Sequence, residues 1–170
     1  MYARTATVAI TLALVGAVVA GAHASAAEPA VSCDRIVLRD HSGTKDGFRL
    51  LLEAVSVPGA RHLGRETAAA RGGQWRWYRN AGLAIRAGTS SVSVSVPDGW
   101  RDRVALSWGG RRPTSSIAFA QCAGSAAGTW NFFSGGIHLS RRADCVPLRV
   151  TVGGMSTTVR VGVGRACGGL

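Results

Sequence analysis

The 170-residue sequence contains a single lysine, nine acidic residues and few aromatic side chains. Because 20 basic residues outnumber those nine acids, the formal net charge is +11. Polar low-complexity tracts are missing: 46% of the residues are hydrophobic, and the 23 glycines follow no three-residue period. These features exclude a disordered chain and a collagen-like fibre. The length fits one ordinary domain and is too short for a large multidomain enzyme.

Familiar catalytic and metal-binding motifs are also missing. The sequence has no G-x-S-x-G, no H-E-x-x-H, no phosphate-binding glycine loop and no C-x-x-C spacing. A secreted hydrolase remains an alternative, since His41 or His62 could meet a serine and a carboxylate through folding. His138 alternates with Ile137 and Leu139, so we expect it on the surface of a strand. We predict a protein without enzymatic activity, cofactor or metal.

The first 27 residues have the pattern of a secretory signal peptide. Arg4 is the only charged residue before Glu28, an apolar run covers residues 8–20, and small residues with an A-x-A site follow at 24–26. A retained membrane anchor is the alternative, because the uncharged stretch is about long enough to cross a bilayer. We expect cleavage after residue 26 or 27, which leaves a single domain, residues 28–170, without a transmembrane segment. This secreted location disfavours a nucleic-acid partner.

Four cysteines remain in the expected mature chain: Cys33, Cys122, Cys145 and Cys167. An even number of cysteines in an exported protein indicates two disulfides, and three pairings are open. We favour Cys122–Cys145, which would clamp a glycine-rich hairpin region, together with Cys33–Cys167, which would join the two ends of the domain. A zinc site is the less favoured use of these cysteines.

Short alternating runs separated by turn signals predict β-structure throughout the mature chain. Serine and valine alternate over 91–96, and Gly153–Gly154 between two such runs is typical of a hairpin turn with positive φ. The polar segment 61–73 is predicted to be a long loop. We expect an all-β fold, an antiparallel, immunoglobulin-like β-sandwich of about eight or nine strands, stapled by two disulfides. The candidate strands are 35–38, 48–57, 83–86, 91–96, 103–108, 116–120, 129–133, 136–139, 147–152 and 156–163.

The segment from Gln74 to Asn80 reads Gln-Trp-Arg-Trp-Tyr-Arg-Asn and is the most distinctive in the chain. In an extended conformation its two tryptophans share one face of the strand. Exposed rings beside guanidinium groups can stack on sugars and bind anionic substituents. The alternative is that a tryptophan fills the core, as we expect for Trp108. The predicted binding residues are Trp75, Arg76, Trp77 and Arg79.

A set of motifs lies in 52–58, 77–83, 94–103, Trp130, Gly135–Gly136, 145–148 and 162–167. Together these motifs resemble a family of uncharacterised, exported, β-rich proteins of high-GC bacteria. The resemblance spans about residues 48–168 and implies no activity, because the family has none assigned. The cysteine, tryptophan and Gly-Gly positions that carry it have a structural character.

We therefore expect a secreted binding or structural module, associated with the cell envelope, that contacts an anionic or sugar-bearing envelope polymer. The high net charge would promote this attraction. A second possibility is a protein-recognition module, such as a protease inhibitor, whose partner is an extracellular protein. The third is the secreted hydrolase described above.

Overall fold

The computed structural model describes residues 30–43, 48–59, 68–69, 73–142 and 144–167. The predicted signal peptide and most of the predicted 61–73 loop lie outside these residues. Almost all the regular structure is β, as the alternating runs predict, with two short 3-10 helices. The elements are η1 (Cys33–Arg35), β1 (Ile36–Asp40), β2 (Phe48–Leu51), β3 (Val55–Pro58), β4 (Ala68–Ala69), β5 (Trp77–Asn80), β6 (Leu83–Arg86), β7 (Val92–Ser95), η2 (Asp98–Trp100), β8 (Val104–Leu106), β9 (Ser116–Phe119), β10 (Trp130–Phe133), β11 (Gly136–Leu139), β12 (Asp144–Val152) and β13 (Met155–Val163).

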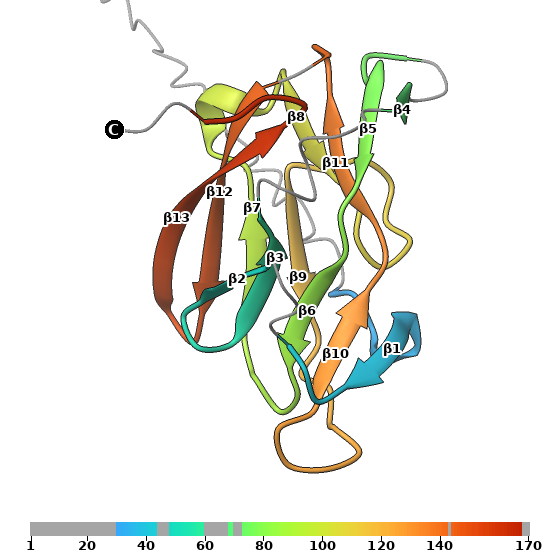
Figure 1. Ribbon diagram of the computed structural model, residues 1–170, viewed down its shortest axis with the longest axis vertical. Helices are drawn as coiled ribbons and strands as arrows, with labels where there is room; N and C mark the ends of the chain where they lie inside the picture. Colours follow the sequence, from blue (N-terminus) through green and yellow to red (C-terminus); the bar gives the residue numbers. More distant parts are fainter. Residues whose placement is uncertain (1–29, 44–47, 60–67, 70–72, 143, 168–170) are drawn as a thin grey trace, which may run out of the picture.

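The strands form three antiparallel sheets (Figure 1). One has the order β1-β10-β6-β3-β2, the second β4-β5-β11-β8, and the third β13-β12-β7-β9. The prediction of an all-β, antiparallel fold with two disulfides is confirmed. The strands are more numerous than the eight or nine expected, partly because turns divide a run that we predicted as one strand. The finer prediction, an immunoglobulin-like sandwich, stays a prediction.

Two long segments pass from one sheet into the next. The segment of β5 and β6 and the segment of β10 and β11 run antiparallel and bend together, as the ribbon in Figure 1 shows. At the bend, the Ala81 N–H donates to the Gly135 carbonyl at 2.8 Å. A Cβ atom at Gly135 would lie 2.0 Å from the Ser107 carbonyl oxygen. Only a glycine fits this close approach of two backbones, so the Gly-Gly pair here permits a bend and not a hairpin.

The predicted strand 48–57 is wrong as a single element. The chain reverses between β2 and β3, and Leu52 and Glu53 adopt φ values of +48° and +55°. Apolar residues continue into this turn, with Leu50, Leu51 and Leu52 in succession, so the apolar pattern could not reveal it. The hairpin at Gly153–Gly154 is confirmed, with Val152 opposite Met155 and positive φ at both glycines. The difference is that glycine signals a positive φ in the sequence, whereas Leu52 and Glu53 do not.

One apolar core is shared by all three sheets. Alternating residues of β7 bury Val92 and Val94, as predicted. Trp108 is 1% exposed and its Nε1 donates to the Ala81 carbonyl at 2.6 Å, which confirms its predicted place in the core. The rings of Phe119 in β9 and Phe133 in β10 lie 5.0 Å apart and join two of the sheets.

The favoured disulfide pairing is wrong: the bonds are Cys33–Cys122 and Cys145–Cys167. The N-terminal segment lies beside β9, because Val31 exchanges backbone hydrogen bonds with Ala118 and Ala120. This places Cys33 next to Cys122.

At the other end of the chain, Cys145 is opposite Gly162 in the β12–β13 hairpin. The segment after Val163 then folds back on Gly162, with Cys167 N 3.2 Å from where a Cβ of Gly162 would be. The docking of the N-terminal segment on β9 decides the first disulfide, and the register of β12 against β13 decides the second. No cysteine is left free to serve as a metal ligand. The part of the chain that the structure describes also lacks a helix with the length and apolarity that a membrane crossing requires.

Candidate functional site

Three segments rich in tryptophan and arginine meet at one end of the β4-β5-β11-β8 sheet. Trp77 begins β5, Leu139 ends β11 and Val104 begins β8, and Leu139 is paired with both of the other two. The segments that extend beyond this row are therefore neighbours: 73–76, 98–103 and 140–142. We call residues 73–77, 98–103 and 140–142 the Trp–Arg end. It contains Trp75, Trp77, Trp100, Arg76, Arg101, Arg103, Arg141 and Arg142.

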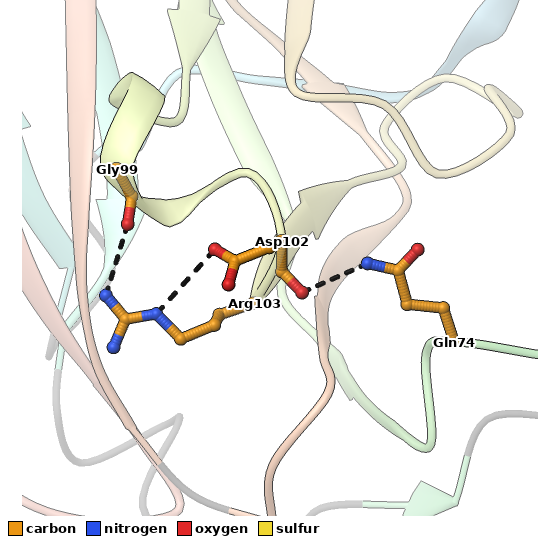
Figure 2. Close-up of polar contacts among 4 residues, drawn as sticks. All are labelled: Gln74, Gly99, Asp102 and Arg103. Atoms are coloured by element: carbon orange, nitrogen blue, oxygen red, sulfur yellow. Dashed lines mark hydrogen bonds and ion pairs between the residues drawn. The ribbon is translucent and has the colours of Figure 1, made fainter.

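Backbone and amide contacts tie these segments together. Gln74 Nε2 donates to the Asp102 carbonyl at 3.0 Å, so the chain before β5 is fastened to the loop before β8 (Figure 2). The Ser140 N–H donates to the Arg103 carbonyl at 3.0 Å. Segments from three separate parts of the sequence are thus held at fixed positions relative to one another.

Arg103 is the best-anchored cation of this end. Its Nη2 donates to the Gly99 carbonyl at 3.3 Å, and its Nε lies 3.9 Å from the Asp102 carboxylate (Figure 2). The guanidinium carbon lies 3.9 Å from the centroid of the Trp100 ring, a cation–π arrangement. These contacts hold Arg103 in place and organise the loop around it.

The two tryptophans Trp77 and Trp100 are half-buried and pack against the core. A guanidinium lies over each ring: Arg103 over Trp100, and Arg142 over Trp77 at 5.8 Å from the ring centroid. A ligand approaching these two rings therefore meets arginine before it meets indole. This arrangement can bind anionic groups more readily than it can stack on a bare sugar ring.

The predicted binding residues are distributed unevenly. Trp75 is half-buried and Arg76 is exposed, and both lie at the Trp–Arg end with Trp77. Arg79 lies two residues further along β5, opposite the buried Ile137, and is half-buried. The structure thus gathers three of the four residues at the end of the sheet and places Arg79 towards its middle.

Two exposed arginines of this end are available to a ligand. Among the residues that the structure describes, Arg76 and Arg141 have no ion-pair or hydrogen-bond partner. Arg101, in contrast, forms an ion pair with Asp98 at 2.7 Å. Local composition marks the segment from Trp75 to Arg79 in the sequence, but nothing local shows that 98–103 and 140–142 are its neighbours. Only strand pairing brings those segments together.

A separate polar cluster lies on the outer face of the same sheet. His138 in β11 is opposite Tyr78 in β5, and their rings are 4.7 Å apart. His138 Nε2 is hydrogen-bonded to Ser107 Oγ at 2.8 Å. Burial lowers the pKa of His138, since the charged imidazolium is poorly solvated there. Burial also raises the pKa of Tyr78, and a hydrogen bond with Ser107 opposes this effect.

The Ser107–His138 contact resembles part of a hydrolase site but lacks the third member. His138 Nδ1 is buried without a hydrogen-bond partner in the described part of the chain, so no carboxylate orients the ring from that side. The predicted alternative used His41 or His62. His41 is exposed, and its neighbours Asp40 and Ser42 hydrogen-bond to each other. His62 lies outside the described residues.

Comparisons with known proteins add no assignment. No family model matches the chain, and a search of curated proteins finds no significant match. The resemblance to a family of exported proteins of high-GC bacteria therefore stays a prediction.

Proposed function

We propose that the protein is a secreted, non-catalytic binding module of the immunoglobulin-like sandwich type that attaches to an anionic polymer of the cell envelope through its Trp–Arg end. The observation that carries the proposal is the meeting of five arginines and three tryptophans from three segments at one end of a sheet. The signal-peptide pattern and the two disulfides support a location outside the cytoplasm, since disulfides persist in oxidising compartments.

The geometry favours charge recognition over sugar stacking. Arg142 and Arg103 lie over Trp77 and Trp100. A guanidinium that stacks on a ring keeps N–H donors at its edge, and these suit the oxygens of phosphate or carboxylate groups. Arg76 and Arg141 add two exposed cations beside the stacked pairs. A polymer with regularly spaced anionic groups could contact several of these arginines at once.

The test is a binding experiment with two polymers and two charge-matched variants. A poly(glycerol phosphate) chain is the anionic probe, and a neutral glucan of similar length is the uncharged one. Replacing Arg76 and Arg141 by glutamine should weaken binding to the anionic polymer about tenfold, at roughly 0.7 kcal/mol for each exposed cation. The wild-type affinity should fall as salt concentration rises.

The control removes the same charge from another surface. Arg149 and Arg160 are exposed on the β12–β13 hairpin, and Arg149→Gln with Arg160→Gln lowers the net charge equally. We expect this control to retain nearly the wild-type affinity. Equal weakening by both double variants would indicate non-specific attraction to a basic protein and contradict the proposed site. Tighter binding of the glucan would contradict the preference for anions.

A further inference from the structure

A hollow lies between the N-terminal segment and the loop that follows β8. Val31 is 2% exposed and holds the N-terminal segment against β9 through two backbone hydrogen bonds. The same side chain packs on Gly109, where a Cβ atom would lie 2.3 Å from Val31 Cγ1. The Cys33–Cys122 disulfide fixes the segment further. The hollow has a volume of about 420 Å³.

Two arginines line this hollow, and none of the described residues that line it is acidic. Arg35 and Arg111 contribute from its two sides, together with Ser32 and Gly110. Arg35 reaches across to the glycine loop, since its Nη1 lies 3.5 Å from where a Cβ of Gly110 would be. The lining therefore carries two positive charges that face one cavity.

Backbone groups of the loop add to the donor set. Gly109 and Gly110 both adopt positive φ, +63° and +76°. The Gly109 N–H donates to Ser134 and the Arg111 N–H to Trp108, whereas the Gly110 N–H has no partner among the described residues. Gly110 itself lines the hollow, so its backbone N–H is a candidate donor to an oxyanion bound there.

The carboxylate of Asp34 lies beside Arg35 but outside the lining. Asp34 accepts a hydrogen bond from Ser32 Oγ and lies 3.7 Å from Arg35 Nε. The hydrogen bond from Ser32 is the main cause that lowers the pKa of Asp34, so this carboxylate is ionised at neutral pH. It competes with any anion in the hollow for Arg35. Removing the charge of Asp34 should therefore strengthen anion binding, which tests the site.

We infer that this hollow is a second binding site, separate from the Trp–Arg end, for a phosphate monoester on a small molecule. Two guanidinium groups match the double negative charge of such a phosphate, and their planar donor edges match its oxygens. The volume exceeds that of phosphate alone and falls within the range of roughly 300–1,000 Å³ that is usual for small-molecule sites. The remaining space accommodates the group that carries the phosphate.

The experiment is isothermal titration calorimetry on the disulfide-bonded chain, with inorganic phosphate, glucose 6-phosphate and glucose as probes. Glucose 6-phosphate should bind saturably and glucose should not. Arg35→Gln and Arg111→Gln should each weaken glucose 6-phosphate binding about tenfold. Asp34→Asn should tighten it severalfold, because the Asp34 carboxylate then no longer competes for Arg35. Binding of phosphate as tight as that of glucose 6-phosphate would contradict the assignment of a larger ligand.

Matched controls distinguish binding in the hollow from non-specific attraction to a basic protein and from binding at the Trp–Arg end. Arg149→Gln removes the same charge elsewhere, and the Arg76→Gln, Arg141→Gln variant removes charge from the Trp–Arg end; both should bind glucose 6-phosphate like the wild type. Because Arg35 is exposed, we expect Arg35→Gln to disturb folding less than the other substitutions in this site. Equal weakening by Arg149→Gln and Arg35→Gln, or no saturable binding by the wild type, would overturn the inference.

Discussion

At the scale of single residues, Trp77 and Trp100 both pack against the core and offer a ring face to an arginine. Each is half-buried against the core, and each has a guanidinium over its ring. The sequence predicted the presence of aromatic and basic groups around Trp77 because they are adjacent in the chain. It could not predict that Arg142 and Arg103 are the stacking partners, since one of them lies 65 residues away along the chain from the ring it covers.

His138 provides a prediction about pH. Its folded pKa is below the usual value of 6.5, so between that lowered value and 6.5 the unfolded chain binds a proton that the folded chain does not. Stability should therefore be highest above pH 6.5 and decrease as the pH falls through this window. His138→Gln removes the titrating group and can keep an amide contact to Ser107.

Urea unfolding midpoints at pH 7.5 and pH 5 measure this effect. We expect the wild type to lose more stability over that interval than His138→Gln. The other histidines are common to both proteins, so their contributions cancel in the comparison. Identical pH dependence in the two proteins would show that His138 is as accessible to protons as a histidine in the unfolded chain.

At the scale of elements, the β2–β3 turn is the clearest departure from the sequence prediction. Leu52 and Glu53 occupy the left-handed region, which costs an L-residue roughly 1–2 kcal/mol. Glu53 is exposed, so Glu53→Gly should relieve strain without loss of packing. We expect a gain in stability of up to about 1 kcal/mol, measured by the free energy of unfolding in urea.

A glycine placed in an ordinary strand serves as the matched control. Thr158 is exposed in the middle of β13, and Thr158→Gly should lower stability by about 1 kcal/mol because glycine gains flexibility in the unfolded chain. If both substitutions destabilise the protein to the same extent, the positive φ at Glu53 is not a source of strain.

Elements whose signals are local were predicted well. The alternation in β7 and the Gly-Gly turn between β12 and β13 depend on a few consecutive residues, and both are confirmed. The bend at Ser134–Gly136 depends instead on Ser107 and Arg79, whose carbonyl groups approach Gly135 and Gly136 from other strands. Such an approach has no signature in the local sequence, so a glycine pair there could not be told from a turn.

At the scale of the whole molecule, the disulfides connect the fold in two places. Cys33–Cys122 joins residues 89 positions apart, and Cys145–Cys167 joins residues 22 positions apart. Because each bond lowers the entropy of the unfolded chain, the two bonds stabilise the fold by about 4–5 and about 3 kcal/mol, respectively. The paired replacement Cys33→Ser with Cys122→Ser should therefore lower the thermal midpoint more than Cys145→Ser with Cys167→Ser.

Thermal unfolding followed by circular dichroism compares the two variants, and both replace a complete pair so that no free thiol remains. A larger loss for the Cys145–Cys167 variant would contradict the loop-length argument. Peptide mapping without reduction gives an independent check of the pairing. The number of disulfides could be predicted from an even cysteine count, but the pairing required the docking of Val31 on β9 and the register of β12 against β13.

The proposed function requires that the Trp–Arg end binds an anionic polymer. The most direct measurement is a titration of the isotope-labelled chain with poly(glycerol phosphate), followed by the NMR signals of the tryptophan indoles and arginine side chains. We expect saturable shifts for Trp75, Trp77, Trp100, Arg76 and Arg141, with Trp108 and Arg149 unchanged. Shifts of similar size for arginines over the whole surface, or shifts concentrated on the β12–β13 hairpin, would contradict it.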